Sequence, residues 1–207
     1  MTITYKTDDS FFTTVFPPFI YYGWIVKSWL SKNDTAKFRY IRDTEIEQEF
    51  WNIQQINDVY PEIKTIAIVV NPWARIRYAY SQLCIMKENN QLSSLDLDFL
   101  KLDSFSKFVN DLPNLPASAG NFWFTLTTPM CKWFDYAVDG ESKTVDYILK
   151  DTSLESDFQL LQDYFSSNVP LDTPKKLPSY KRFYNKKTRE IVAALFKEDI
   201  ERFNYEF

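Results

Sequence analysis

The sequence predicts an α/β protein, a three-layer fold with a small central parallel sheet flanked by helices. Two observations predict this class. Residues 65–70, TIAIVV, form a continuous apolar run without polar alternation, which is typical of a parallel strand covered on both faces. Strand patterns and helix patterns also alternate along the chain, and parallel strands need crossover connections that are usually helical. The absence of a repeat or a long linker favours a single domain over residues 1–207.

Composition excludes several classes of function. The chain has no histidine, which excludes imidazole-based nucleophile activation and histidine-ligated zinc, and we expect no metal. Its three glycines, Gly23, Gly120 and Gly140, are too widely spaced for a glycine-rich phosphate loop or a dinucleotide fingerprint. The net charge of −4 gives no general field that would attract nucleic acid or an anionic membrane. Cys84 and Cys131 are isolated in apolar surroundings, as expected of reduced thiols.

The first half of the chain contains two strand-turn-helix patterns. Residues 11–16 predict a short strand, and after Pro17-Pro18 residues 22–30 predict a helix. A second helix is predicted over residues 45–57, before the buried strand. Asn71-Pro72 then predicts an N-cap and a first helical residue. The following helix shows helical spacing of Trp73, Ile76, Tyr80 and Leu83.

The second half predicts a hairpin and two helices. Residues 132–149 alternate around Asp139-Gly140, a hairpin turn signal. Thr152 and Glu155 predict a capping box, and the helix that they open should bury Leu154, Phe158, Leu161 and Phe165. Asn185 is suited to cap one last helix. Its apolar stripe consists of Ile191, Val192, Leu195, Phe196, Ile200 and Phe203.

Three segments, in the same order along the chain, resemble sulfotransferase-family proteins. Residues 69–83, VVNPWARIRYAYSQL, resemble the family's strand-to-helix segment with its Arg-Asn-Pro motif. Residues 145–165 resemble its hairpin strand, turn and following helix, and residues 180–207 resemble its terminal helix. The resemblance implies a sulfotransferase-like α/β fold, related to P-loop NTPases, that binds 3′-phosphoadenosine 5′-phosphosulfate and transfers its sulfuryl group to a hydroxyl or an amine.

Compared with the family's first phosphate-binding loop, this sequence is altered. In residues 17–28, PPFIYYGWIVKS, Gly23 matches the family's loop, but bulky side chains replace its lysine and small residues. Such side chains obstruct the close backbone approach that a phosphosulfate needs. Lys27, one helical turn further on, is either a displaced phosphate ligand or a solvated lysine.

The family's second phosphate-binding segment is the strand-to-helix junction, and two of its phosphate ligands are missing from this sequence. The family's phosphate-contacting arginine falls at Val70 and its serine at Tyr78. Arg75 matches a family arginine and is expected to pair with an internal carboxylate, with cofactor binding as the alternative. Arg77 has no counterpart, and it is either a replacement cation or an exposed charge.

One segment of the sequence has a composition that indicates an anion-binding site. Between residues 175 and 189 there are seven basic residues and no acid. Lys175 and Lys176 are the best candidates for an anion ligand, because the family's loop here closes over the nucleotide. Lys186 and Lys187 would lie in the first turn of a helix, where positive charge opposes the helix dipole. The alternative is a solvated loop.

At the hairpin turn, Lys150 replaces the arginine of the family.

We therefore expect a degenerate sulfotransferase-like protein that has lost its donor site, binds no cofactor and serves as a binding or structural component. The alternative is an active transferase with a rebuilt site. A compact chain without an anchor resembles the bacterial and bacteriophage branch of the family, which implies the cytoplasm, or a virion if it is phage-encoded. We expect a protein partner or an oligomer, and neither nucleic acid nor a membrane. Tyr21, Tyr22 and Trp24 are the interface candidates, because exposed aromatic residues are enriched at protein interfaces.

Overall fold

The computed structural model describes residues 2–6, 11–15, 39–40, 64–93, 98–115, 126–138, 140–164, 170 and 179–207. The chain divides into two compact units. The first consists of Met1–Pro17, Tyr21–Val69 and Met130–Lys175, and the second of Pro18–Ile20, Val70–Pro129 and Lys176–Phe207. The helices expected at residues 22–30 and 45–57 lie outside the described residues.

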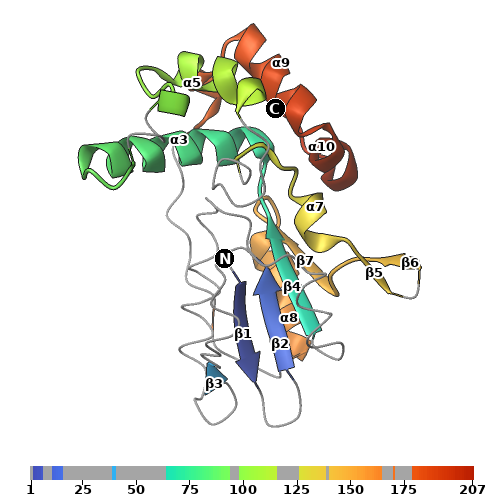
Figure 1. Ribbon diagram of the computed structural model, residues 1–207. Helices are drawn as coiled ribbons and strands as arrows, with labels where there is room; N and C mark the ends of the chain where they lie inside the picture. Colours follow the sequence, from blue (N-terminus) through green and yellow to red (C-terminus); the bar gives the residue numbers. More distant parts are fainter. Residues whose placement is uncertain are drawn as a thin grey trace. The chain divides into compact units, whose positions relative to one another are not determined.

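The first unit contains a five-stranded sheet with the order β3-β1-β2-β4-β7 (Figure 1). Strands β2, β4 and β7 are parallel, whereas β1 is antiparallel to both β2 and β3. The protein is thus a mixed α/β protein with a small parallel sheet. The strands are β1 (Thr2–Lys6), β2 (Phe11–Val15), β3 (Arg39–Tyr40), β4 (Lys64–Val69) and β7 (Tyr147–Lys150). The sequence predicted β2 and β4, but not the antiparallel strands β1 and β3.

Strand β4 is the buried centre of this unit. Its neighbours on both sides are parallel, and Ile68 is 0% exposed, as the apolar run predicted. Thr65 fixes the register with the next strand, because its Oγ1 donates to Asp146 Oδ2 at 2.8 Å and accepts from Asp146 N at 3.0 Å. Burying each isoleucine of this strand contributes about 1.5 to 3 kcal/mol.

The predicted hairpin is present but shorter than expected. Strands β5 (Tyr136–Val138) and β6 (Glu141–Lys143) are antiparallel, and Gly140 has a φ of 81°, a conformation that glycine adopts without strain. The prediction of a strand over the preceding residues was wrong, since Cys131–Phe134 forms the short helix α7. Its Trp133 and Phe134 are buried, so packing of this apolar pair decides the conformation. Asp139 lies outside the described residues.

Helix α8 (Leu154–Tyr164) follows β7 and packs against it (Figure 1). Leu154 and Phe158 are buried as predicted, whereas the side chains of Leu161 and Phe165 are not among those described. The predicted capping box was wrong. The helix begins after Ser153, whose Oγ donates to Asp157 Oδ2 at 2.8 Å, and the same oxygen accepts from Lys150 N at 2.8 Å.

The second unit is helical. Helices α3 (Pro72–Glu88), α5 (Phe105–Asp111) and α9 (Lys186–Leu195) pack against one another, and α10 (Lys197–Phe203) follows α9 (Figure 1). Two 3₁₀ turns, η1 (Leu112–Asn114) and η2 (Lys181–Phe183), complete it. The sequence predicted one last helix, but the helix is interrupted at Phe196, whose φ of −114° and ψ of 30° are not helical. Phe196 is nevertheless fully buried, so the break keeps the apolar stripe on the core.

Candidate functional site

The best-defined candidate site is the amino end of α3, where the chain leaves β4. Asn71 Oδ1 accepts from Trp73 N at 3.1 Å and from Ala74 N at 3.4 Å, and Arg75 N donates to Asn71 O at 2.9 Å. Pro72 has no N–H. The N-cap and the first helical residue are therefore as predicted. The amide donors of the first turn, which would otherwise attract an anion, are already used.

The last residues of the chain close over this junction. Asn71 Nδ2 donates to Glu206 O at 2.9 Å, and the rings of Trp73 and Phe207 meet edge to face at 5.5 Å. Trp73 Nε1 donates to Arg189 O at 3.0 Å, and Tyr184 Oη donates to Trp73 O at 2.8 Å. The amino end of α3 is thus covered by the protein's own groups.

Arg75 lies in the core of the second unit, only 1% exposed. Its Nη1 donates to Thr128 O at 3.2 Å, and its guanidinium lies 5.4 Å from the centre of the Phe196 ring. Burial lowers the pKa of Arg75 to about 10, and the charge of Asp199 opposes that shift. Asp199 is itself 0% exposed. The structure therefore places Arg75 beside an internal carboxylate, the arrangement expected if its role is structural.

Arg77 is half-buried among aromatic rings of α3, α5 and η2. Its guanidinium lies 3.9 Å from the centre of the Phe183 ring, 5.7 Å from that of Tyr80 and 5.8 Å from that of Phe105. Its Nη1 donates to Ser81 Oγ, and its buried Nε has no hydrogen-bond partner among the residues described. For a half-buried cation, cation–π contacts of this kind together contribute about 0.5 to 2 kcal/mol.

Two tyrosines beside Arg77 are held in the neutral form. Burial raises the pKa of Tyr184 above its ordinary value, the nearby Tyr180 raises it further, and Arg77 opposes both. Burial, followed by a hydrogen bond with Cys84, raises the pKa of Tyr80 to about 12. A phenol with a raised pKa is a poor general base at neutral pH. Neither tyrosine is therefore suited to accept the proton of an acceptor hydroxyl.

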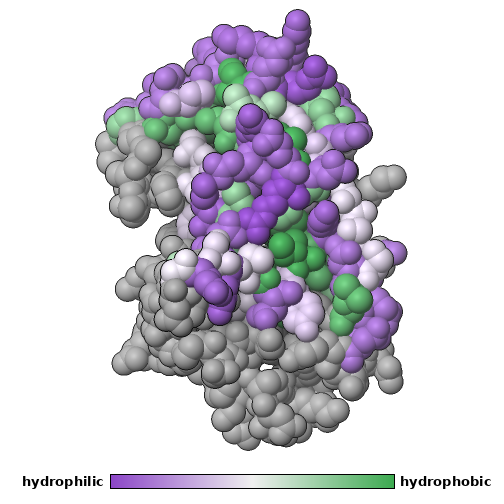
Figure 2. Space-filling view, turned by 90° about the vertical axis from the view of Figure 1, so that its right-hand side faces the viewer, coloured by the Kyte–Doolittle hydropathy of each residue, from purple (hydrophilic) through white to green (hydrophobic). Residues whose placement is uncertain are grey.

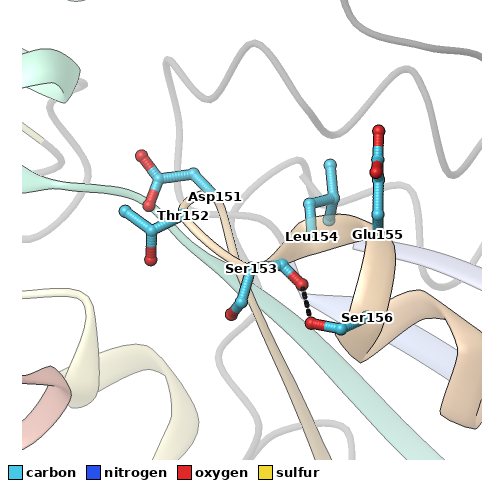
Figure 3. A pocket seen from close by; sticks show the side chains of 6 residues that line it. All are labelled: Asp151, Thr152, Ser153, Leu154, Glu155 and Ser156. Carbon is cyan, nitrogen blue, oxygen red and sulfur yellow. Dashed lines mark hydrogen bonds between the residues drawn. The ribbon is translucent and has the colours of Figure 1, made fainter.

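A second strand-to-helix junction, between β7 and α8, contains an open pocket of about 430 Å³. Figure 3 shows the carboxylates of Asp151 and Glu155 projecting from opposite ends of the turn. Ligands of α/β proteins often bind at the carboxyl ends of parallel strands, so the position is suitable for a site. The described lining contains carboxylates and hydroxyls and no cation, which disfavours a phosphosulfate. It consists of Asp151, Thr152, Ser153, Leu154, Glu155 and Ser156.

Among the predicted site residues, the structure describes Arg75 and Arg77, which lie on α3 in different surroundings. The others lie outside the described part of the chain: Gly23, Lys27, Lys175, Lys176, Tyr21, Tyr22 and Trp24. Sequence reasoning did not single out Asp199 as the charge beside Arg75. Its signal was an acid between Phe196 and Phe203, at helical spacing on an otherwise apolar stripe.

The chain matches no family model, and neither the curated proteins nor the solved structures contain a significant match to it. Within the described ranges, no helix has the length and apolar character needed to cross a membrane. The same part of the chain contains no group of three or more cysteine or acidic side chains that could hold a metal ion. Cys84 and Cys131 are both thiols that form no disulfide, as predicted.

Proposed function

We propose that this chain is a three-layer, sulfotransferase-like protein without a working site for 3′-phosphoadenosine 5′-phosphosulfate, and that it acts as a binding or structural component of a protein assembly. The observation that carries the proposal is the closed amino end of α3. The first-turn amides there donate to Asn71, and the segment around Glu206 and Phe207 covers them.

The side chains around this junction support the same proposal. Val70, at the position of the family's phosphate-contacting arginine, is 4% exposed and apolar. Arg75, the arginine that the resemblance would offer to the nucleotide, lies instead beside Asp199. Losing two charge-assisted contacts of about 1.5 to 3 kcal/mol each lowers affinity by roughly two to four decades. We expect the protein to work in the cytoplasm, or in a virion if it is phage-encoded.

Calorimetric titration with adenosine 3′,5′-bisphosphate tests the proposal. We expect weak binding or none, and the same result with adenosine 5′-monophosphate, the control that lacks the 3′-phosphate. Low-micromolar binding that depends on the 3′-phosphate would contradict the proposal. It would favour the alternative, an active sulfotransferase with a rebuilt donor site.

A further inference from the structure

Charge is strongly segregated near the carboxyl end of the sequence. Residues 151–174 contain five acids and no base, whereas residues 175–189 contain seven bases and no acid. Five of these bases are exposed in the second unit, and we call them the basic surface: Lys181, Arg182, Lys186, Lys187 and Arg189. Without these five, the chain has 19 basic and 28 acidic residues, a balance of −9. One surface of an acidic protein is therefore positively charged.

Aromatic rings hold this basic surface together. The Phe207 ring centre lies 5.6 Å from Lys181 Nζ and 5.2 Å from Arg189 Cζ. The Phe183 ring centre lies 4.9 Å from Arg182 Cζ and 3.9 Å from Arg77 Cζ. Each ring thus gathers two like charges. Hydrophilic residues predominate on the upper part of the face in Figure 2, at the height of α9 and α10.

Lys181 Nζ donates to Phe207 O at 2.8 Å, but no acid pairs with the other four bases within the part of the chain that the structure describes. The two ion pairs with measured distances there, Lys107–Asp103 and Lys197–Glu201, do not involve the basic surface. Lys186 and Lys187 also lie in the first turn of α9, where the helix dipole disfavours a cation. Bound negative charge would relieve both the repulsion among like charges and the dipole penalty.

The first unit presents a surface of opposite charge. The exposed residues of α8 follow helical spacing and form one stripe, which we call the acidic face. Leu160 lies on this face and is 61% exposed, one of two large apolar side chains so exposed among the described residues. Acids at both ends of an exposed leucine are complementary to cations that surround aromatic rings. The acidic face consists of Glu155, Ser156, Gln159, Leu160 and Asp163.

We infer that the basic surface of one chain binds the acidic face of a second copy. Because the contact joins two different surfaces, a single contact leaves each copy with one of them unoccupied, so the contact can repeat from copy to copy. The inference deepens the proposed function, on which it rests, because it names the partner of a structural component. A single-stranded nucleic acid fits less well, since its bases need open aromatic faces and the protein's own cations already contact Phe183 and Phe207.

Sedimentation velocity of the full chain over a concentration series tests this inference. We expect self-association at low salt that weakens about tenfold or more near 1 M salt, where the screening length is about 3 Å. Lys186→Glu with Lys187→Glu lowers the charge of the basic surface from +5 to +1, and Glu155→Lys with Asp163→Lys reverses the charge of the acidic face. Each double variant should stay monomeric. Lys101→Glu with Lys143→Glu makes the same change in net charge as the basic-surface variant, at exposed positions elsewhere, and should assemble like the parent.

Mixing the two double variants gives the sharpest outcome. The pair retains one intact basic surface and one intact acidic face, so an equimolar mixture should form dimers that grow no further. Monomeric parent protein at low salt would overturn the inference, as would undiminished assembly of either variant. Binding of inorganic phosphate or of a nucleic-acid oligonucleotide that is lost with Lys186→Glu and Lys187→Glu, without self-association, would assign the surface to that ligand instead. The nucleotide titration above is a separate readout, so a monomeric chain that binds no nucleotide refutes only this inference.

Discussion

The two strand-to-helix junctions differ in how they use the same local geometry. At the first, β4 leads through Asn71 into α3, and an amide cap, a buried arginine and the end of the chain fill the space. At the second, β7 leads through Ser153 into α8, and the turn remains an open pocket with carboxylates on its rim. One junction is closed by packing, and the other is open but carries negative charge.

This difference shows that a strand-to-helix turn is not by itself an anion site. Donors must be free and positive charge must be near, and each of the two junctions lacks at least one of these conditions. At α3 the amides already donate to Asn71, and at α8 the Asp157 carboxylate occupies the turn by accepting from Ser153 and Lys150. Substitutions at the two junctions should therefore lower the free energy of unfolding by different amounts.

The largest effect is expected at Arg75. Arg75→Ala leaves the buried Asp199 carboxylate without that cation, so the free energy of unfolding should fall by about 3 to 5 kcal/mol. Arg77→Ala, the matched control on the same half of α3, removes a half-buried cation and should cost about 1 kcal/mol. Chemical denaturation measures both. Equal losses would show that Arg75 is not the structural arginine, and Arg75→Met with Asp199→Leu should regain much of the stability.

The next effect is expected at the caps. Asn71→Ala removes the side-chain acceptor for two amides and the donor to Glu206, and should cost about 1 to 2 kcal/mol. Ser153→Ala at the open junction removes one hydrogen bond to Asp157 and should cost about 0.5 to 1 kcal/mol. Thermal melting compares the two variants. A larger loss at Ser153 would reverse the proposed difference between the junctions.

A smaller effect is expected at Tyr184. Tyr184→Phe leaves Trp73 O without this donor, at a cost of about 1 kcal/mol. Tyr80→Phe is the matched control, since its hydroxyl donates to Leu102 O over a longer 3.3 Å. Urea denaturation should rank Tyr184→Phe below Tyr80→Phe in stability. If Tyr80→Phe were the less stable variant, the hydrogen bond of Tyr184 to Trp73 O would not be the stronger of the two.

The smallest effect is a pH dependence in the alkaline range. The pKa of Tyr80 is raised from 10.0 to about 12 in the folded protein, so its contribution to stability is complete below pH 10 and is lost as the pH rises through 12. Absorbance titration of the parent should detect a phenolate that forms near pH 12, and Tyr80→Phe should remove that component, while Tyr184 titrates at still higher pH. If the phenolate absorbance that the variant lacks forms near pH 10 in the parent, the raised pKa of Tyr80 is contradicted.

The sequence predicted elements whose cause is local. Asn71-Pro72 and Asn185 cap helices as expected, and the apolar run around Ile68 is the buried strand. These predictions succeeded because capping depends on neighbouring residues, and because a strand buried on both faces must be apolar along its length.

Features that depend on long-range packing were not predicted. The position of Arg77 depends on Phe105 and Phe183, which lie far away in sequence. Helix α8 begins after Ser153 and not after Thr152, and the Ser153 hydroxyl donates to Asp157, a residue that the predicted capping box did not include. An internal carboxylate was expected beside Arg75, but which acid supplies it, Asp199, is decided by such contacts, which no local pattern contains.

Amide hydrogen exchange at Trp73, Ala74 and Arg75 tests most directly whether the amino end of α3 is closed. These three amides donate to Asn71 in the structure, so they should exchange slowly in the free protein. Adding adenosine 3′,5′-bisphosphate in excess should leave their exchange rates unchanged. Fast exchange in the free protein that becomes slow with the nucleotide would contradict the account, because it would mean that the amides are free and that the anion binds them.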